Sequence, residues 1–331
     1  MKRCSPLAAA TLALTSPVFA QEEPHGAPSP NQIVDAAPGE DWRQIAAEDL
    51  LVMTLAPDRD GNSRVVVIQL IPAPFSGGWV SNIRNLARAG WYDGVSVNRV
   101  QDNYVVQWGD ANADSPESEG QGKVLPVGLR VIEESNYTYH PRKVCHVSAG
   151  DGEPNCMQPF FRRMKRLDAI KQGLTDGFYQ GFPVSRDEER IWPIHCYGMV
   201  GVGRSFSPDT GSGAELYTVI GQAPRHLDRN VALVGRLIEG IEHLSSLPRG
   251  TGTLGFYESA EEQVPIQSMR VASELESVFR PSFEYLSPTS VSFARYADAR
   301  ANRRDPFFNI PAGGVDVCNI PVPVRRVVNG E

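Results

Sequence analysis

The sequence predicts a mainly β protein. Short runs of strand-forming residues recur along the chain, several of them alternating apolar with polar positions as strands with one buried face do. The 331 residues include 26 prolines and 30 glycines, which indicates that many turns and loops join these strands. The predicted strands lie at 50–55, 64–70, 95–100, 104–108, 124–133, 197–204, 216–220, 231–237 and 266–275.

Helical spacing is confined to a few segments. Trp79, Ile83, Leu86 and Ala87 follow the i, i+4, i+7, i+8 spacing of one buried helix face, and Gly90 suits a left-handed C-cap. Further helices are predicted at 159–175, at 239–247 and after Pro288-Thr289, where Phe293, Tyr296, Ala297 and Arg300 share a face. The many basic side chains of 159–175 are interpreted as a solvated helix face.

The amino-terminal residues have the pattern of a secretory signal. Basic Lys2 and Arg3 precede an apolar stretch at 7–14, and Val18-Phe19-Ala20 suits a signal peptidase site. We therefore expect an exported protein, periplasmic or secreted, that is cleaved after Ala20. Residues 21–40 are polar and rich in proline and alanine, so we expect a flexible leader before order begins near Asp41.

Charge and hydropathy exclude some classes of partner. The net charge of −7 argues against a general nucleic-acid or anionic-membrane binder. Beyond the signal, no window approaches the roughly 20 apolar residues that a membrane-spanning helix needs. The protein is expected to be a monomer without metal or cofactor.

Four cysteines remain after signal cleavage, namely Cys145, Cys156, Cys196 and Cys318. An even number in an oxidising compartment suggests two disulfides, for which three pairings are possible. The short, Gly- and Asp-containing separation favours Cys145–Cys156, which leaves Cys196–Cys318 as a long-range link. The alternative is a zinc site that uses His140 and His146 with Cys145 and Cys156, but its spacing matches no common zinc pattern.

Two further motifs have ordinary structural interpretations. Residues 250–255, GTGTLG, match the dinucleotide-binding pattern, but a helix end precedes them where that motif needs a strand, so we interpret them as a loop. His195, next to Cys196, is predicted to be a packed core residue, because the six histidines form no ligand cluster.

The most informative stretch is 91–110, WYDGVSVNRVQDNYVVQWGD. Strand alternation puts Val95, Val97 and Arg99 on one face, and Val105 and Gln107 together on a face of the next strand. An arginine on an apolar face requires an anionic partner, backbone carbonyls or a ligand. A salt bridge at a sheet edge and a functional site are both open interpretations from these residues alone.

The order of several blocks resembles the cyclophilin family of peptidyl-prolyl isomerases. Helix 79–90 and the turn Tyr92-Asp93-Gly94 match the start of the family pattern, and the rest of 91–110 matches its F-H-R-V-I-P-G-F-M-I-Q-G-G-D block. The segments 198–204, 213–217 and 227–240 then follow in family order. The resemblance covers about a third of the chain.

This resemblance implies a closed antiparallel barrel of eight strands, capped by two helices. Residues 41–110 and 195–276 would form the barrel, 111–194 an insertion between two strands, and 277–331 a carboxy-terminal extension. A Cys196–Cys318 disulfide would tie that extension to the barrel.

The resemblance also implies a site and an activity. Arg99 falls on the family's catalytic arginine, which would stabilise the twisted amide of an X-Pro bond in proline-containing polypeptides. Departures at His226, Val231 and Val97-Asn98 reshape the pocket, so a peptide-binding chaperone or scaffold of the cell envelope with little or no turnover is the alternative. The residues that match substrate-binding positions are Gln107, Tyr104, Val105, Gly203, Arg204, Glu215, Tyr217, His226 and Leu227.

Overall fold

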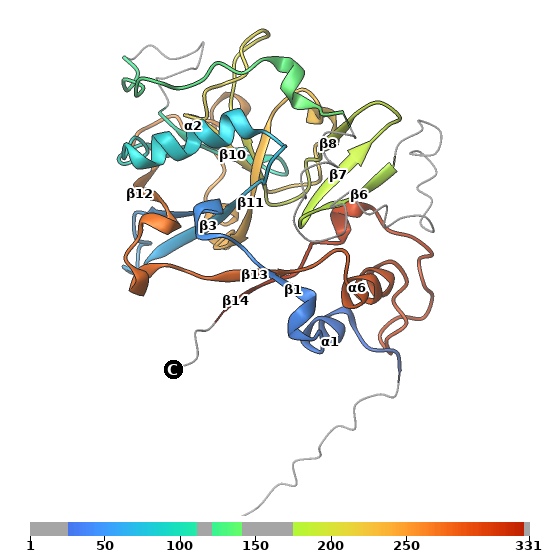
Figure 1. Ribbon diagram of the computed structural model, residues 1–331. Coiled ribbons are helices and arrows are strands. Elements are labelled where there is room, and N and C mark those ends of the chain that lie inside the picture. Colours follow the sequence, from blue (N-terminus) through green and yellow to red (C-terminus); the bar gives the residue numbers. More distant parts are fainter. Residues whose placement is uncertain (1–25, 111–120, 141–174, 328–331) are drawn as a thin grey trace, which may run out of the picture.

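A computed structural model describes residues 26–110, 121–140 and 175–327, and its central unit is a closed barrel of eight antiparallel strands (Figure 1). The predicted mainly β fold and eight-stranded barrel are thus confirmed. Around the barrel the strands follow the order β10, β5, β4, β12, β2, β3, β11, β9. Their bounds are β2 Leu50–Leu55, β3 Arg64–Leu70, β4 Ser96–Val100, β5 Val105–Gly109, β9 Met199–Val202, β10 Leu216–Val219, β11 Leu233–Glu239 and β12 Val264–Val271.

Alternate residues of the strands fill the barrel. Leu51 and Met53 of β2 and Val66 and Ile68 of β3 are fully buried members of the main core. Burial of such side chains contributes about 1.5–3 kcal/mol each. The bounds of β2 and β3 agree with the prediction, because each strand is an uninterrupted run of strand-forming residues and a polar turn separates the two runs.

Helices pack against the barrel strands β12 and β3. The first, α2 (Gly77–Arg88), buries Trp79, Ile83 and Leu86, and Gly90 has the left-handed φ of +62° predicted for its C-cap. The second, α5 (Glu242–Ser245), contributes Leu244 to the core. It is shorter than the predicted helix 239–247, because β11 continues to Glu239.

A separate sheet covers the outside of the barrel. It consists of β1 (Trp42–Gln44), β13 (Phe283–Leu286) and β14 (Val324–Arg326), so it joins segments from the two ends of the described chain (Figure 1). Ile45 and Phe283 pack with Leu50 and Val67, which point outward from β2 and β3. These two barrel strands are consequently buried on both faces.

The predicted leader is wrong in its second half. Helix α1 (Pro30–Asp35) forms there, with Ser29 and Gln32 in a reciprocal capping box. Ile33 is buried, and α1 packs against α6 (Val291–Ala301), which is the helix predicted after Pro288-Thr289. The apolar contact with a helix distant in sequence supplies the stability that a six-residue helix lacks by itself.

The described residues between β5 and β9 include a small sheet that was not predicted. Its strands are β6 (Thr175–Tyr179), β7 (Phe182–Arg186) and β8 (Ile191–Pro193). The predicted strand 124–133 is wrong, because side chains satisfy the backbone of this segment in place of a neighbouring strand. Asn82 bonds both the N–H and the carbonyl of Arg130, and the hydroxyl of Thr210 donates to the carbonyl of Ile132.

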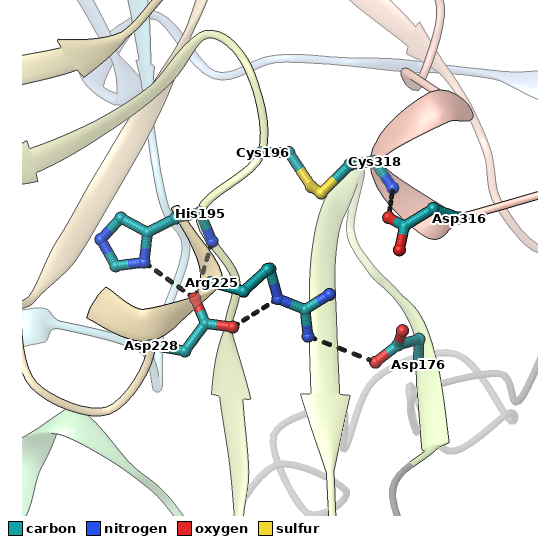
Figure 2. Close-up of a disulfide and its surroundings, with 7 residues drawn as sticks. All are labelled: Asp176, His195, Cys196, Arg225, Asp228, Asp316 and Cys318. Carbon is teal, nitrogen blue, oxygen red and sulfur yellow. Dashed lines mark hydrogen bonds and ion pairs between the residues drawn. A yellow bond between two sulfur atoms is a disulfide. The ribbon is translucent and has the colours of Figure 1, made fainter. Parts of the chain in front are cut away.

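Cys196 and Cys318 form the predicted long-range disulfide (Figure 2). It joins the segment before β9 to the turn η8 (Val317–Asn319), which ties the extension to the barrel. In the described parts of the chain, no helix has the length and apolar character needed to cross a bilayer. The signal segment, residues 159–174 of the predicted helix 159–175, the Cys145–Cys156 pair and all of the zinc alternative except His140 lie outside the described residues. Thr175, the last residue of that predicted helix, begins β6.

Candidate functional site

Four neighbouring barrel strands place a row of residues on the outer face. Arg99 of β4 pairs across the sheet with Gln107 of β5, Gln107 pairs with Tyr217 of β10, and Tyr217 pairs with Gly201 of β9. The side chain of Tyr217 fills the space above Gly201, where a Cβ atom would lie 2.3 Å from its ring. A glycine at this position is therefore needed for the ring to lie flat against the sheet.

A β-bulge determines which way Arg99 points. Val97 pairs with Trp108 and Arg99 pairs with Gln107. Between these two pairs β4 advances by two residues, whereas β5 advances by one. Val97 is buried in the barrel, whereas Arg99 lies on the outer face. The prediction that Arg99 shares a face with Val97 is therefore wrong, because a bulge breaks strict alternation. The predicted shared face of Val105 and Gln107 is correct, since both line the same cavity.

The Arg99 guanidinium is held by three oxygen acceptors. Its Nε donates to the carbonyl of Leu254 at 2.8 Å, Nη1 donates to Oε1 of Gln107 at 3.1 Å, and Nη2 donates to the side-chain oxygen of Gln101. The rings of Tyr104 and Phe256 lie 5.7 and 5.2 Å from its Cζ. Burial lowers the pKa of Arg99 from its ordinary value, although an arginine stays protonated at neutral pH.

Glu215 fixes the orientation of Gln107. The Gln107 amide donates to Oε2 of Glu215, and Asn98 donates to Oε1 of Glu215 at 3.4 Å. Because the nitrogen of the Gln107 amide faces Glu215, its oxygen faces Arg99. Only 8% of the Gln107 and Glu215 surfaces are exposed, so this polar row is sheltered from water.

A cavity of about 420 Å³ opens beside Arg99. Val105, Tyr217 and Val219 form a small apolar cluster beneath it, separate from the barrel interior, and Tyr104 and Val231 pack against that cluster. The residues that line the cavity are Arg99, Tyr104, Val105, Gln107, Val202, Gly203, Arg204, Ser205, Phe206, Glu215, Tyr217, Leu227, Val231, Leu254 and Phe256.

Arg99 and eight of the nine predicted substrate-binding residues line this cavity, and His226 does not. The His226 ring is exposed and stacks on Tyr104 from outside, with ring centroids 6.3 Å apart. Gly203 and Glu215 meet where a Cβ on Gly203 would lie 2.8 Å from that of Glu215. No described residue of 121–140 or 175–194 contributes to the lining.

Sequence reasoning missed the wall that the loop 250–256 provides. Leu254 and Phe256 line the cavity, and the carbonyl of Leu254 accepts from Arg99. Gly255 has a φ of +81°, and a Cβ there would lie 2.8 Å from Cα of Gln101. The glycines of the GTGTLG segment thus allow this loop to lie close to the end of β4. Their spacing was the sequence signal that could have located this wall of the cavity.

A buried network lies behind Tyr217. Its hydroxyl is 2.8 Å from Nε2 of His195, and Nδ1 of His195 is 2.8 Å from Oδ1 of Asp228. Asp228 also accepts from Arg225 at 2.5 Å, and Arg225 approaches Asp176 of β6 at 3.6 Å (Figure 2). The network therefore connects the cavity to the small sheet before β9.

Burial determines the protonation of this network. It lowers the pKa of His195 and raises that of Tyr217, so both are neutral near pH 7. Oδ1 of Asp228 accepts from the backbone N–H of His195 as well as from the ring. The His195 proton therefore belongs on Nδ1, and Nε2 accepts from the Tyr217 hydroxyl. His195 is fully buried, as predicted.

Comparison with known proteins gives one family and one fold. The family model for cyclophilin type peptidyl-prolyl cis-trans isomerases matches residues 78–271, which is more than half of the chain. The structure is similar to cyclophilin AquaCyp293 from Hirschia baltica, with a TM-score of 0.61 and 20% identity over 88% of this chain and 95% of that one.

Other matches are more distant. A cyclophilin type isomerase from Cryptosporidium parvum matches at 10% identity and a TM-score of 0.36, over 67% of this chain and 96% of that one. No curated protein sequence matches the chain significantly. The extent of the family match and the closed barrel together show that the chain belongs to the cyclophilin-type peptidyl-prolyl cis-trans isomerase family and has the enzyme class of that family.

Proposed function

We propose that the cavity beside Arg99 binds an X-Pro segment and that Arg99 catalyses its isomerisation. The observation that carries this proposal is the position of one oriented guanidinium at the edge of an apolar cavity. The proline ring would rest on the cluster of Val105 and Tyr217, with Leu227 beside it. Gln107 would bind the peptide backbone.

The reaction needs a donor more than it needs a nucleophile. Rotation about the X-Pro bond has a barrier of roughly 18–20 kcal/mol because the twisted amide loses its resonance. In the twisted state the proline nitrogen regains its lone pair. A fixed donor aimed at that nitrogen binds the twisted state more tightly than either planar state, which accelerates the reaction.

Arg99 keeps donors for this purpose. A guanidinium carries five N–H groups, and in the described structure the acceptors on Leu254, Gln107 and Gln101 take three of them. Two N–H groups on Nη1 and Nη2 therefore remain for a substrate. The three protein acceptors hold the group in place before substrate arrives, which lowers the cost of ordering it in the transition state.

The test is the rate constant kcat/KM of Arg99→Ala and Arg99→Lys in a proline-peptide isomerisation assay. Loss of one transition-state donor costs about 10²–10³-fold in well-studied enzymes, and we expect a loss in that range for Arg99→Ala. Arg99→Lys retains charge without the fork geometry, so we expect partial activity. Arg295→Ala, an exposed arginine on α6, is the matched control. Equal rates for wild type and Arg99→Ala would refute the proposal.

The second candidate is a peptide-binding chaperone with little turnover. Its supporting observation is the altered rim, where His226 lies outside the cavity and the aliphatic Val231 lines it. NMR exchange spectroscopy on a proline peptide separates the two candidates. Line broadening of bound peptide without exchange between its cis and trans signals would favour the chaperone.

We propose that the protein is exported and is cleaved after Ala20. In the periplasm or outside the cell it assists the folding of other exported polypeptides. The Cys196–Cys318 disulfide supports this location, because such bonds persist in oxidising compartments. Fractionation of cells followed by amino-terminal sequencing tests it. A protein that retains residues 1–20 in the cytoplasmic fraction would contradict it.

A further inference from the structure

A second cavity, of about 220 Å³, lies where three parts of the chain meet. The barrel contributes Met199 and Leu237, the turn between β6 and β7 contributes Gly181, and the extension contributes residues 317–324. The disulfide Cys196–Cys318 lies on its wall. It shares no lining residue with the cavity beside Arg99.

Among the described residues that line this cavity, Arg236 of β11 is the one cationic residue. It is 8% exposed. Its Nε donates to Oε1 of Gln69 at 2.8 Å and its Nη1 to the carbonyl of Val322 at 3.5 Å. Its Nη2 is buried without a hydrogen-bond partner in the described structure, and the ring of Phe182 lies 5.1 Å from its Cζ.

Arg236 also lacks a counter-charge among the residues that the structure describes. None of the ion pairs between described residues includes it. Burial lowers the pKa of Arg236 to about 10, so the group remains charged at neutral pH. An unpaired buried ion carries a penalty of several kcal/mol, and proteins normally compensate such ions with a partner of opposite charge.

A glycine lies close to the guanidinium. A Cβ on Gly181 would lie 3.0 Å from Nη2 of Arg236 and 3.2 Å from the Tyr285 ring. Gly181 has a φ of +88°, which favours glycine in this turn as well. The turn therefore lies close to Nη2 of Arg236 and places no side chain of residue 181 against it.

We propose that this cavity is a binding site for a carboxylate that carries a short apolar tail. A planar guanidinium matches a carboxylate in bidentate geometry, which would engage the free Nη2. The side chains of Met199, Leu237, Ile320 and Val322 would surround the tail. Drug-sized ligands occupy roughly 300–1,000 Å³, so this smaller cavity fits a short acid or the last residue of a peptide.

The two sources of such a carboxylate can be separated by calorimetry or ligand-observed NMR on the full chain. Hexanoate and hexanamide are the first pair of probes, and N-acetyl-Ala-Val with a free or amidated carboxyl terminus is the second. We expect saturable binding of at least one carboxylate at up to millimolar concentration, and none of either amide. Binding of hexanoate alone assigns a free acid, and binding of the dipeptide acid assigns a peptide terminus.

Arg236→Met tests the role of the guanidinium, with Arg295→Met as the matched control at an exposed site. We expect Arg236→Met to weaken carboxylate binding by at least about tenfold, while the control binds as wild type does. Circular dichroism establishes whether the variant folds. The proposal is overturned if neither carboxylate binds, if the amides bind equally well, or if a folded Arg236→Met binds the carboxylates as tightly as wild type. The comparison of acids with amides needs only wild-type protein.

Discussion

Arg99 and Gln107 face each other across β4 and β5, with Nη1 of the arginine 3.1 Å from Oε1 of the glutamine. Glu215 holds the other end of the Gln107 amide. The orientation of the proposed catalytic donor therefore depends on a glutamine whose own orientation is set by a carboxylate two strands away.

Gln107→Leu tests this dependence. The variant removes an acceptor of Arg99 and the proposed contact with the peptide backbone, and it leaves a shorter, apolar side chain. We expect kcat/KM to fall by about tenfold or more, equivalent to about 1.4 kcal/mol. Gln222→Leu, at an exposed glutamine outside the cavity lining, is the control. An unchanged kcat/KM in Gln107→Leu would show that the reaction does not depend on the contact between Gln107 and Arg99.

Phe256→Ala tests the loop wall. The ring lies 5.2 Å from the Arg99 guanidinium and lines the cavity. A cation–π contact of this kind contributes about 0.5–2 kcal/mol, so we expect kcat/KM to fall several-fold, and Phe256→Tyr to retain activity. Phe279→Ala removes an exposed ring remote from the cavity and serves as control. Equal losses in the two alanine variants would mean that the loss does not arise at the site.

The disulfide is expected to stabilise the fold. Replacing both Cys196 and Cys318 by serine should lower the free energy of unfolding by about 2–5 kcal/mol, since the bond closes a long loop in the unfolded chain. Urea unfolding measures the change. As a control, wild type and the Cys196/Cys318 variant are also unfolded under reducing conditions, where the difference that this bond makes should disappear. Identical unfolding midpoints for wild type and the Cys196/Cys318 variant would contradict the expectation.

His195 makes stability depend on pH. Its pKa is lowered in the folded protein by burial, so the unfolded chain binds the proton more readily. Stability contributed by the neutral imidazole is therefore full above the unfolded pKa of about 6.5 and is lost as pH falls below it. Urea unfolding between pH 7.5 and 5 should show this loss in wild type and a smaller loss in His195→Gln. Parallel pH profiles for the two proteins would refute the assignment.

Some of this structure could be predicted from the sequence and some could not, for physical reasons. β2, β3 and α2 are specified by local patterns of apolar residues and by Gly90. The bulge that turns Arg99 outward arises from pairing with β5, which strict alternation along β4 does not reveal. Arg99 itself was located by its family pattern, although its assumed neighbours on the strand face were wrong.

The remaining errors in the secondary structure predicted from the sequence share one cause. α1 is stable because it packs on α6, and the short strands β1, β6, β8, β13 and β14 are stabilised by partners that local periodicity does not identify. Segment 124–133 has strand-forming residues, but Asn82 and Thr210 satisfy its backbone. In each case a contact with a residue elsewhere in the chain outweighs the local preference.

The sheet formed by β1, β13 and β14 also sets an order of events during synthesis. β1 is complete by Gln44, but its partner β13 begins at Phe283, and the outer strand β14 ends at Arg326. At roughly 5–20 residues per second, β1 waits on the order of ten seconds or longer for its partner. All eight barrel strands are translated in that interval. The barrel can therefore close before the sheet that covers β2 and β3 forms, and until then the outward side chains of Leu50 and Val67 face water.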